Sequence, residues 1–107
     1  MSTVNVAGKW KSLGNGIELE IHQNGTKIES AFDSTEFAHK LRGELNVGRG
    51  YFDYTVARKN IKDGCETVMT GRLRYWNETQ LATDIEGTDG RCDLKADFKE
   101  HLIWTRA

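Results

Sequence analysis

Gly8-Lys9-Trp10 begins the first apolar segment of this chain, and Trp104-Thr105-Arg106 ends the last one. Between these two stretches the sequence consists of short segments in which apolar and polar residues alternate, a pattern typical of half-buried β-strands. Strands that each bury one face do so efficiently by curling into a barrel, whose first and last strands then pair. We therefore expect the two ends of the chain to meet.

The alternation is clearest over residues 17–22, where isoleucine and leucine alternate with glutamate and histidine. An Asn-Gly pair follows at 24–25 and predicts a tight hairpin, and an Asp-Gly pair at 89–90 predicts another. Over 66–75 we expect Met69, Gly71, Leu73 and Tyr75 to face inward. The predicted strands cover residues 6–10, 17–22, 26–32, 41–47, 51–56, 66–75, 81–85, 92–98 and 102–106.

These segments predict an all-β protein, with residues 1–107 forming a single β-barrel domain. The expected architecture is a small antiparallel up-and-down barrel of about eight strands, closed by its first and last strands. A chain of 107 residues is long enough for one modest core. Residues 33–38 have the weakest strand pattern and are expected to form a single helical turn as a short lid. Residues 58–63 are expected to be a solvated basic loop.

Composition excludes several classes of partner. The chain carries 15 lysines and arginines against 16 aspartates and glutamates, a formal net charge of -1. We therefore expect neither nucleic acid nor a membrane as a partner. The segment Met1-Ser2-Thr3-Val4-Asn5 lacks the basic and apolar regions of a signal peptide, which predicts a soluble cytoplasmic protein. In that compartment Cys65 and Cys92 are expected to be reduced thiols.

The sequence predicts neither a catalytic site nor a metal site. The three histidines are scattered and no Cys-x-x-Cys pair is present, so a four-ligand zinc site is not expected. Cys65 has no neighbouring base in the sequence that would activate its thiol. Glu18 and Glu20 share a strand face, and we interpret them as solvated carboxylates. We therefore expect no enzyme activity and no cofactor.

Several short motifs together resemble the calycins, the group that includes lipocalins, fatty-acid-binding proteins and avidins. They are Gly8-x-Trp10, the hairpin at residues 23–25, the glycines at positions 43 and 71, and the final Trp104-Thr105-Arg106. The resemblance implies that a first-strand tryptophan, here Trp10, packs near one end of the barrel beneath a last-strand arginine, here Arg106. A guanidinium over an indole ring is favourable by about 0.5 to 2 kcal/mol. This pair would close the barrel, and a ligand would enter at the opposite mouth.

The resemblance does not extend to a ligand class. The chain is shorter than a typical lipocalin and lacks the serine, asparagine and tryptophan binding set of avidins. One hypothesis is that the barrel binds a small apolar ligand, with Tyr51, Phe52, Tyr54 and Trp76 as candidate ligand-binding residues. The alternative is a filled barrel that acts as an interaction or homo-oligomerisation domain, with Tyr51, Tyr75 and Trp76 facing a second copy. The two hypotheses differ in whether the barrel is hollow.

Overall fold

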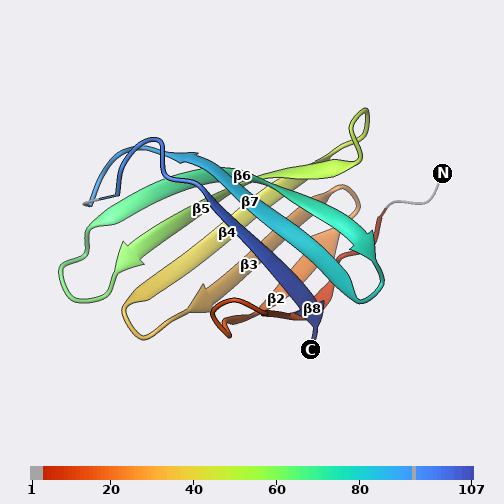
Figure 1. The fold of residues 1–107 in the computed structure, drawn as a ribbon, viewed down its shortest axis with the longest axis horizontal. Helices are drawn as coiled ribbons and strands as arrows, with labels where there is room; N and C mark the ends of the chain where they lie inside the picture. Colours follow the sequence, from red (N-terminus) through yellow and green to blue (C-terminus); the bar gives the residue numbers. More distant parts are fainter. Residues whose placement is uncertain (1–3, 93) are drawn as a thin grey trace.

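The chain forms one closed barrel of eight antiparallel strands (Figure 1). The computed structural model describes residues 4–92 and 94–107. The strands are β1 (Gly8–Ser12), β2 (Glu18–Asn24), β3 (Lys27–Asp33), β4 (Phe37–Asn46), β5 (Tyr51–Asn60), β6 (Glu66–Asn77), β7 (Gln80–Thr88) and β8 (Glu100–Arg106). Each strand pairs with the next, and β1 pairs with β8. The predicted fold class is confirmed, including the meeting of the two ends.

The predicted alternation sets which side of each strand is buried. In β2, Leu19 and Ile21 are buried while the glutamates beside them are exposed. The hairpin predicted from the Asn-Gly pair joins β2 to β3, and Gly25 adopts a φ of 62°, which glycine tolerates because it has no Cβ. In β6 the predicted inward set is also confirmed, because Met69 and Leu73 are buried. Period-two alternation was therefore a sound guide wherever the strand was long and regular.

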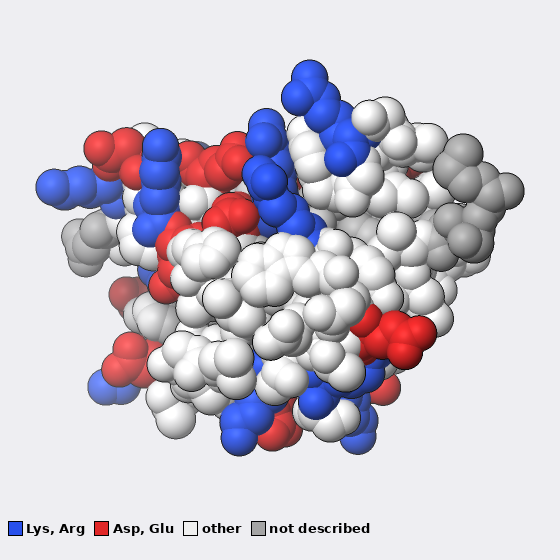
Figure 2. All heavy atoms as spheres, turned by 45° about the vertical axis from the view of Figure 1, so that its right-hand side comes forward, with Lys and Arg blue, Asp and Glu red and all other residues white. Residues whose placement is uncertain are grey.

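The hydrophobic core lies inside the barrel, and most charged side chains lie on its outer surface. On the face shown in Figure 2, basic and acidic groups are interspersed around an uncharged area. The buried core residues are Val6, Trp10, Leu19, Ile21, Ile28, Leu41, Phe52, Tyr54, Val56, Met69, Leu73, Leu81 and Trp104. Every strand from β1 to β8 contributes at least one of them, so the core depends on closure of the whole barrel.

Tyr54 occupies the centre of the sheet because two glycines flank it. It pairs with Gly43 on β4 and with Gly71 on β6. A Cβ added at Gly71 would lie 2.8 Å from the Tyr54 hydroxyl oxygen, and one at Gly43 would lie 3.0 Å from Tyr54 Cβ. The missing Cβ at Gly71 therefore leaves the space in which the phenol ring lies, and the one at Gly43 leaves room for Tyr54 Cβ.

The strand predicted over residues 92–98 is wrong. The connection from β7 to β8 covers residues 89–99 and is irregular over its described part, which leaves out Asp93. Residues 1–3, in the segment where no signal peptide was expected, also lie outside the described residues. The Leu94 amide donates to Arg91 O at 3.1 Å, and the Phe98 amide donates to Lys95 O at 3.0 Å. These short-range turns are incompatible with extended backbone. Leu94 and Phe98 instead pack against the core as two separate anchors, which imitates strand alternation.

Three further local predictions are also wrong. No helical turn forms between β3 and β4, because the Ser34 amide donates to Phe37 O at 2.8 Å and closes a tight hairpin. The predicted basic loop begins too early, since β5 continues to Asn60 and includes Arg58. The strand predicted over residues 41–47 ends one residue earlier, and Val47 is 69% exposed in the turn after β4.

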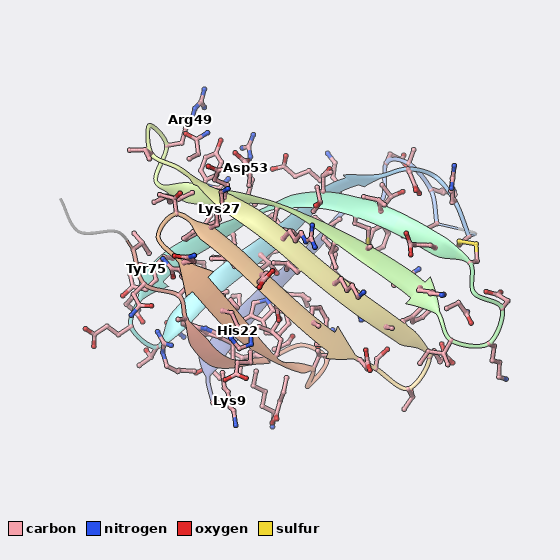
Figure 3. The ribbon with its side chains drawn as sticks, turned by 180° about the vertical axis from the view of Figure 1, so that it is seen from behind. Lys9, His22, Lys27, Arg49, Asp53 and Tyr75 are labelled. Carbon is pink, nitrogen blue, oxygen red and sulfur yellow. A yellow bond between two sulfur atoms is a disulfide. The ribbon has the colours of Figure 1, made fainter. Side chains whose placement is uncertain are left out.

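The two cysteines form a disulfide, which corrects the prediction of reduced thiols. Cys65 and Cys92 are joined with their Cα atoms 5.9 Å apart. The bond ties the connection between β7 and β8 to the start of β6. Figure 3 shows it at the end of the barrel opposite Arg49 and Tyr75. No helix long and apolar enough to cross a bilayer occurs in the described part of the chain.

Candidate ligand-binding cavity

One end of the barrel is closed by Trp10 and Arg106, which face each other across the β1 and β8 pairing. Trp10 is 0% exposed, and its indole Nε1 donates to Val6 O at 2.9 Å. The Arg106 guanidinium carbon lies 4.1 Å from the centre of the Trp10 ring. The predicted contact is therefore present, with Trp10 fully buried and Arg106 half-buried.

Backbone hydrogen bonds hold the arginine of this closure in place. Arg106 Nη1 donates to Ala7 O at 2.6 Å, and Arg106 Nε donates to Glu78 O at 2.8 Å. The guanidinium thus bridges the segment before β1 and the turn between β6 and β7. It joins three chain segments that meet at this end, so its role is structural.

A cavity of about 210 Å³ lies inside the barrel and extends toward the opposite end. Trp10 lines it from the closed end, so the tryptophan of the closure is also the floor of the cavity. Most of the remaining lining is apolar. The apolar lining residues are Ile17, Leu19, Ile21, Phe32, Phe37, Leu41, Val56, Met69, Leu73, Leu81, Ile85, Phe98, Leu102 and Trp104.

The cavity opens at the end where the β1–β2, β3–β4 and β7–β8 connections lie. Asn15, Ser34 and Phe98 line it from these three connections. The β7–β8 connection that carries Phe98 is the one tied down by the disulfide. The covalent bond therefore fixes one side of the mouth.

An aromatic and basic cluster forms the wall of the mouth on β3, β4 and β5. The rings of Phe32 and His39 stack with their centres 4.6 Å apart, and the Arg58 guanidinium carbon lies 4.1 Å from the centre of the Phe37 ring. His39 and Arg58 are register partners on β4 and β5. All four side chains line the cavity.

The surroundings of His39 favour a neutral imidazole. Its Nδ1 lies 3.2 Å from Phe32 O, a carbonyl that can only accept, so Nδ1 carries the proton and Nε2 is left as an acceptor. Burial lowers the pKa of His39 below its ordinary value, and the positive charge of Arg58 lowers it further. The Phe32 carbonyl and Asp33 act in the opposite direction.

Polar atoms of three cavity-lining residues, on β5, β7 and β8, form a small cluster. The Trp104 indole Nε1 donates to Thr83 Oγ1 at 2.8 Å, and the Thr83 hydroxyl also hydrogen-bonds Tyr54. Burial raises the pKa of Tyr54 well above its usual value, against the lowering effect of that hydrogen bond. The phenol therefore stays protonated and uncharged inside the cavity.

The structure does not bring the four predicted ligand-binding aromatic residues together. Tyr54 lines the cavity. Phe52 is buried in the core but does not reach the cavity, and Trp76 is 49% exposed on the outside. Tyr51 lies on the outer surface, where the Arg72 guanidinium carbon is 4.8 Å from its ring centre.

The sequence prediction missed the polar residues of the mouth, among them Arg58 and His39. Both continue the inward alternation of their strands, since Arg58 follows Tyr54 and Val56 at two-residue steps and His39 precedes Leu41. Residues 58–63 were expected to be a basic loop, and this expectation hid the alternation at Arg58. No group of three or more metal-binding side chains occurs among the described residues.

Comparison with protein-family models, curated proteins and solved structures finds no match to this chain. The geometry therefore defines a class of fold: a small, closed, antiparallel up-and-down β-barrel of eight strands. A function for this barrel is inferred from the cavity and from the difference between its closed end and its open mouth.

Proposed function

We propose that this protein binds a small, largely apolar molecule inside its barrel, in the manner of a calycin. The observation that carries the proposal is the cavity of about 210 Å³, closed by Trp10 and open at the other end. Protein cavities of about 150 Å³ lined by leucine, isoleucine and phenylalanine stay dry and bind benzene. The cavity is larger than that and similarly lined, so it suits a molecule of one or two rings or a short chain.

The expected affinity is moderate. A dissociation constant near 1 μM corresponds to about 8 kcal/mol. A ligand with about ten buried heavy atoms reaches this at less than 1 kcal/mol per atom, which is below the ceiling of about 1.5 kcal/mol for very small ligands. A binding function therefore needs no interaction of unusual strength.

The proposal is tested by filling the cavity. Val56 is buried and lines the cavity, whereas its neighbour Thr55 is exposed on the outer face of β5. Val56→Phe places a ring in the cavity, and Thr55→Phe adds the same ring outside it. The melting temperature is measured with saturating indole or naphthalene, since a ligand at about 100 times its dissociation constant stabilises by about 2.7 kcal/mol.

We expect both probes to raise the melting temperature of the wild type and of Thr55→Phe, and to leave that of Val56→Phe unchanged. Leu41→Phe, on β4, is a second filling variant if Val56→Phe does not fold. The proposal is wrong if neither probe stabilises the wild type, or if the filled and unfilled barrels respond alike.

The alternative of a dimerisation surface has less support. Tyr51 is covered by Arg72 and Arg74, and Tyr75 packs against the core, so Trp76 alone of the three predicted residues is openly exposed. The expected aromatic face therefore does not form as one surface. A homodimer remains a proposal that a sedimentation measurement on wild type and Trp76→Ala would decide.

We also propose that the protein works in an oxidising compartment. The expected cytoplasmic location implied two reduced thiols, and Cys65 and Cys92 are instead bonded. Disulfides persist in oxidising environments and are rare where glutathione and thioredoxin keep thiols reduced. Alkylation without prior reduction, followed by intact mass measurement of the natural protein, should find no alkylated cysteine. Two alkylated cysteines would contradict the proposal.

A further inference from the structure

We infer that the ligand is an amphipathic organic acid, whose carboxylate lies against Arg58 at the mouth while its apolar part lies in the cavity. This inference rests on the proposed binding function and specifies the chemistry of the ligand. Three features of the mouth carry it: the position of Arg58, the state of His39, and the placement of the only other charged residue that lines the cavity among those described, Glu100.

Arg58 is a cation that lines a largely apolar cavity, and the Glu100 carboxylate that also lines it is not paired with Arg58. Among the described residues it takes part in no ion pair, whereas Arg72 pairs with Glu86 at 3.4 Å. Its guanidinium carbon lies 4.1 Å from the centre of the Phe37 ring, a contact that holds it at the rim. A half-buried guanidinium with unused donors is suited to bind a carboxylate by two parallel hydrogen bonds.

With a neutral His39, Arg58 is the only full charge among the described residues of this wall that line the cavity. Asp33 and Arg58 are the charged groups that act on the imidazole, and Arg58 together with burial keeps it neutral. A carboxylate bound beside Arg58 would cancel part of that positive field. The neutral ring therefore does not compete for the anion, and a bound acid makes protonation of His39 easier.

Glu100 faces the cavity mouth from β8, which lies three strands away from β5 around the barrel. Its side chain is exposed, so water screens its charge more than the charge of half-buried Arg58. It repels an anion from the β8 side of the mouth and favours the Arg58 side. It also makes a cationic ligand the competing possibility, which the experiment includes.

The strand geometry sets the length of the ligand. Arg58, Val56 and Tyr54 are successive inward positions on β5. At about 3.3 Å per residue, the four steps from Arg58 to Tyr54 span about 13 Å. An acid with its carboxylate at Arg58 and its apolar end near Tyr54 is therefore a ring on a short chain, or a medium-length aliphatic chain.

The experiment uses three molecules that differ only in the terminal group: phenylbutanoate, phenylbutanol and phenylbutylamine. Their affinities are measured by titration calorimetry near neutral pH. We expect the acid to bind the wild type about tenfold more tightly than the alcohol, because its carboxylate makes a charge-assisted hydrogen bond with Arg58. Arg58→Met should reduce the affinity for the acid to that for the alcohol and leave the alcohol unchanged.

The control is Arg42→Met, which removes the same charge from an exposed position on the outer face of β4. The preference for the acid should survive in this variant, and Arg58→Lys should retain part of it. If Arg58→Met is too unstable to titrate, Arg58→Gln is measured in its place. Equal binding of acid and alcohol, or tightest binding of the amine, overturns the inference but leaves the cavity as a binding site. Binding of none of the three to the wild type overturns both proposals.

Discussion

The two ends of the barrel each place an inward-facing arginine on an aromatic ring, and they use it differently. Arg106 lies over Trp10 and Arg58 lies over Phe37, each with its guanidinium carbon 4.1 Å from the ring centre. Arg106 also donates to two backbone carbonyls. Among the described residues no side-chain hydrogen bond or ion pair uses Arg58. The same cation–π contact therefore belongs to a structural closure at one end and to a candidate binding site at the other.

The rings beneath the two arginines differ in burial as well. Trp10 is completely buried and takes part in the core, whereas Phe37 is half-buried at the rim. Arg106 stabilises the fold, because its hydrogen-bond donors are used and the ring beneath it is buried. Arg58 is available to a ligand, because its donors are unused and the ring beneath it is only half-buried. The predictions below test this contrast.

The largest effect is expected from removing the buried ring. Trp10→Ala should lower the free energy of unfolding by about 3 to 5 kcal/mol, because it leaves a large cavity at the floor of the core. Phe37→Ala, the matched change at the open end, should cost about 1 kcal/mol, since less area is buried there. Urea denaturation measures both. Similar losses in the two variants would contradict the contrast.

Loss of the disulfide should destabilise the open end specifically. The bond joins residues 27 positions apart, and a chain-entropy estimate for a closed loop of that length is about 3 to 4 kcal/mol. The double variant Cys65→Ser with Cys92→Ser should lose that much and should bind the acid probe less tightly, because Phe98 is then held less firmly at the mouth. Hydrogen exchange should rise in residues 89–99 and stay unchanged near Trp10. Faster exchange at the closed end instead would refute this assignment.

The two arginines should separate stability from binding. Arg106→Met should cost about 2 kcal/mol, since it removes charged hydrogen bonds to Ala7 and Glu78 and the contact with Trp10. Arg58→Met should change stability by less than about 0.5 kcal/mol, as is usual for a surface substitution, and should act on affinity for the acid. Denaturation and titration of both variants check the two effects. An Arg58 variant as unstable as the Arg106 variant would remove the distinction.

The smallest effect concerns pH. The pKa of His39 is lowered in the folded protein from its ordinary value of 6.5, so the unfolded chain takes up a proton first as pH falls. The stability that this residue contributes is complete above pH 6.5 and is lost as pH falls toward the folded pKa. NMR titration should find the pKa below 6.5 and should find it raised by bound phenylbutanoate. His39→Asn should remove this part of the pH dependence. A pKa that the acid leaves unchanged would place the carboxylate away from this wall.

Local pattern predicted most of the fold. The inward faces of β2, β5 and β6 and the hairpin at Gly25 follow from residues that are neighbours in sequence, so alternation and turn chemistry were sufficient. The same reasoning failed at residues 92–98, where Leu94 and Phe98 are apolar because a loop is anchored at two points. Pattern alone does not distinguish that arrangement from a strand.

The candidate ligand-binding site was harder to predict from the sequence than the fold. The pairing of Cys65 with Cys92 and the volume left between the strands depend on how distant segments pack, and no short window contains that information. The position of Arg58 was accessible in principle, since it continues the alternation of Tyr54 and Val56. At the end of a strand a charged residue can face the mouth of a barrel and remain solvated, so its charge is not a sign that the strand has ended.

The central claim is that the barrel is hollow and binds its ligand inside, and Met69 provides the most direct test. Met69 is buried and lines the cavity, and the only other methionine of the chain is Met1. With labelled methionine methyl groups, titration with phenylbutanoate should shift the Met69 methyl resonance in a saturable way and leave that of Met1 unchanged. A Met69 resonance that does not move while calorimetry reports binding would place the ligand outside the barrel and contradict the account.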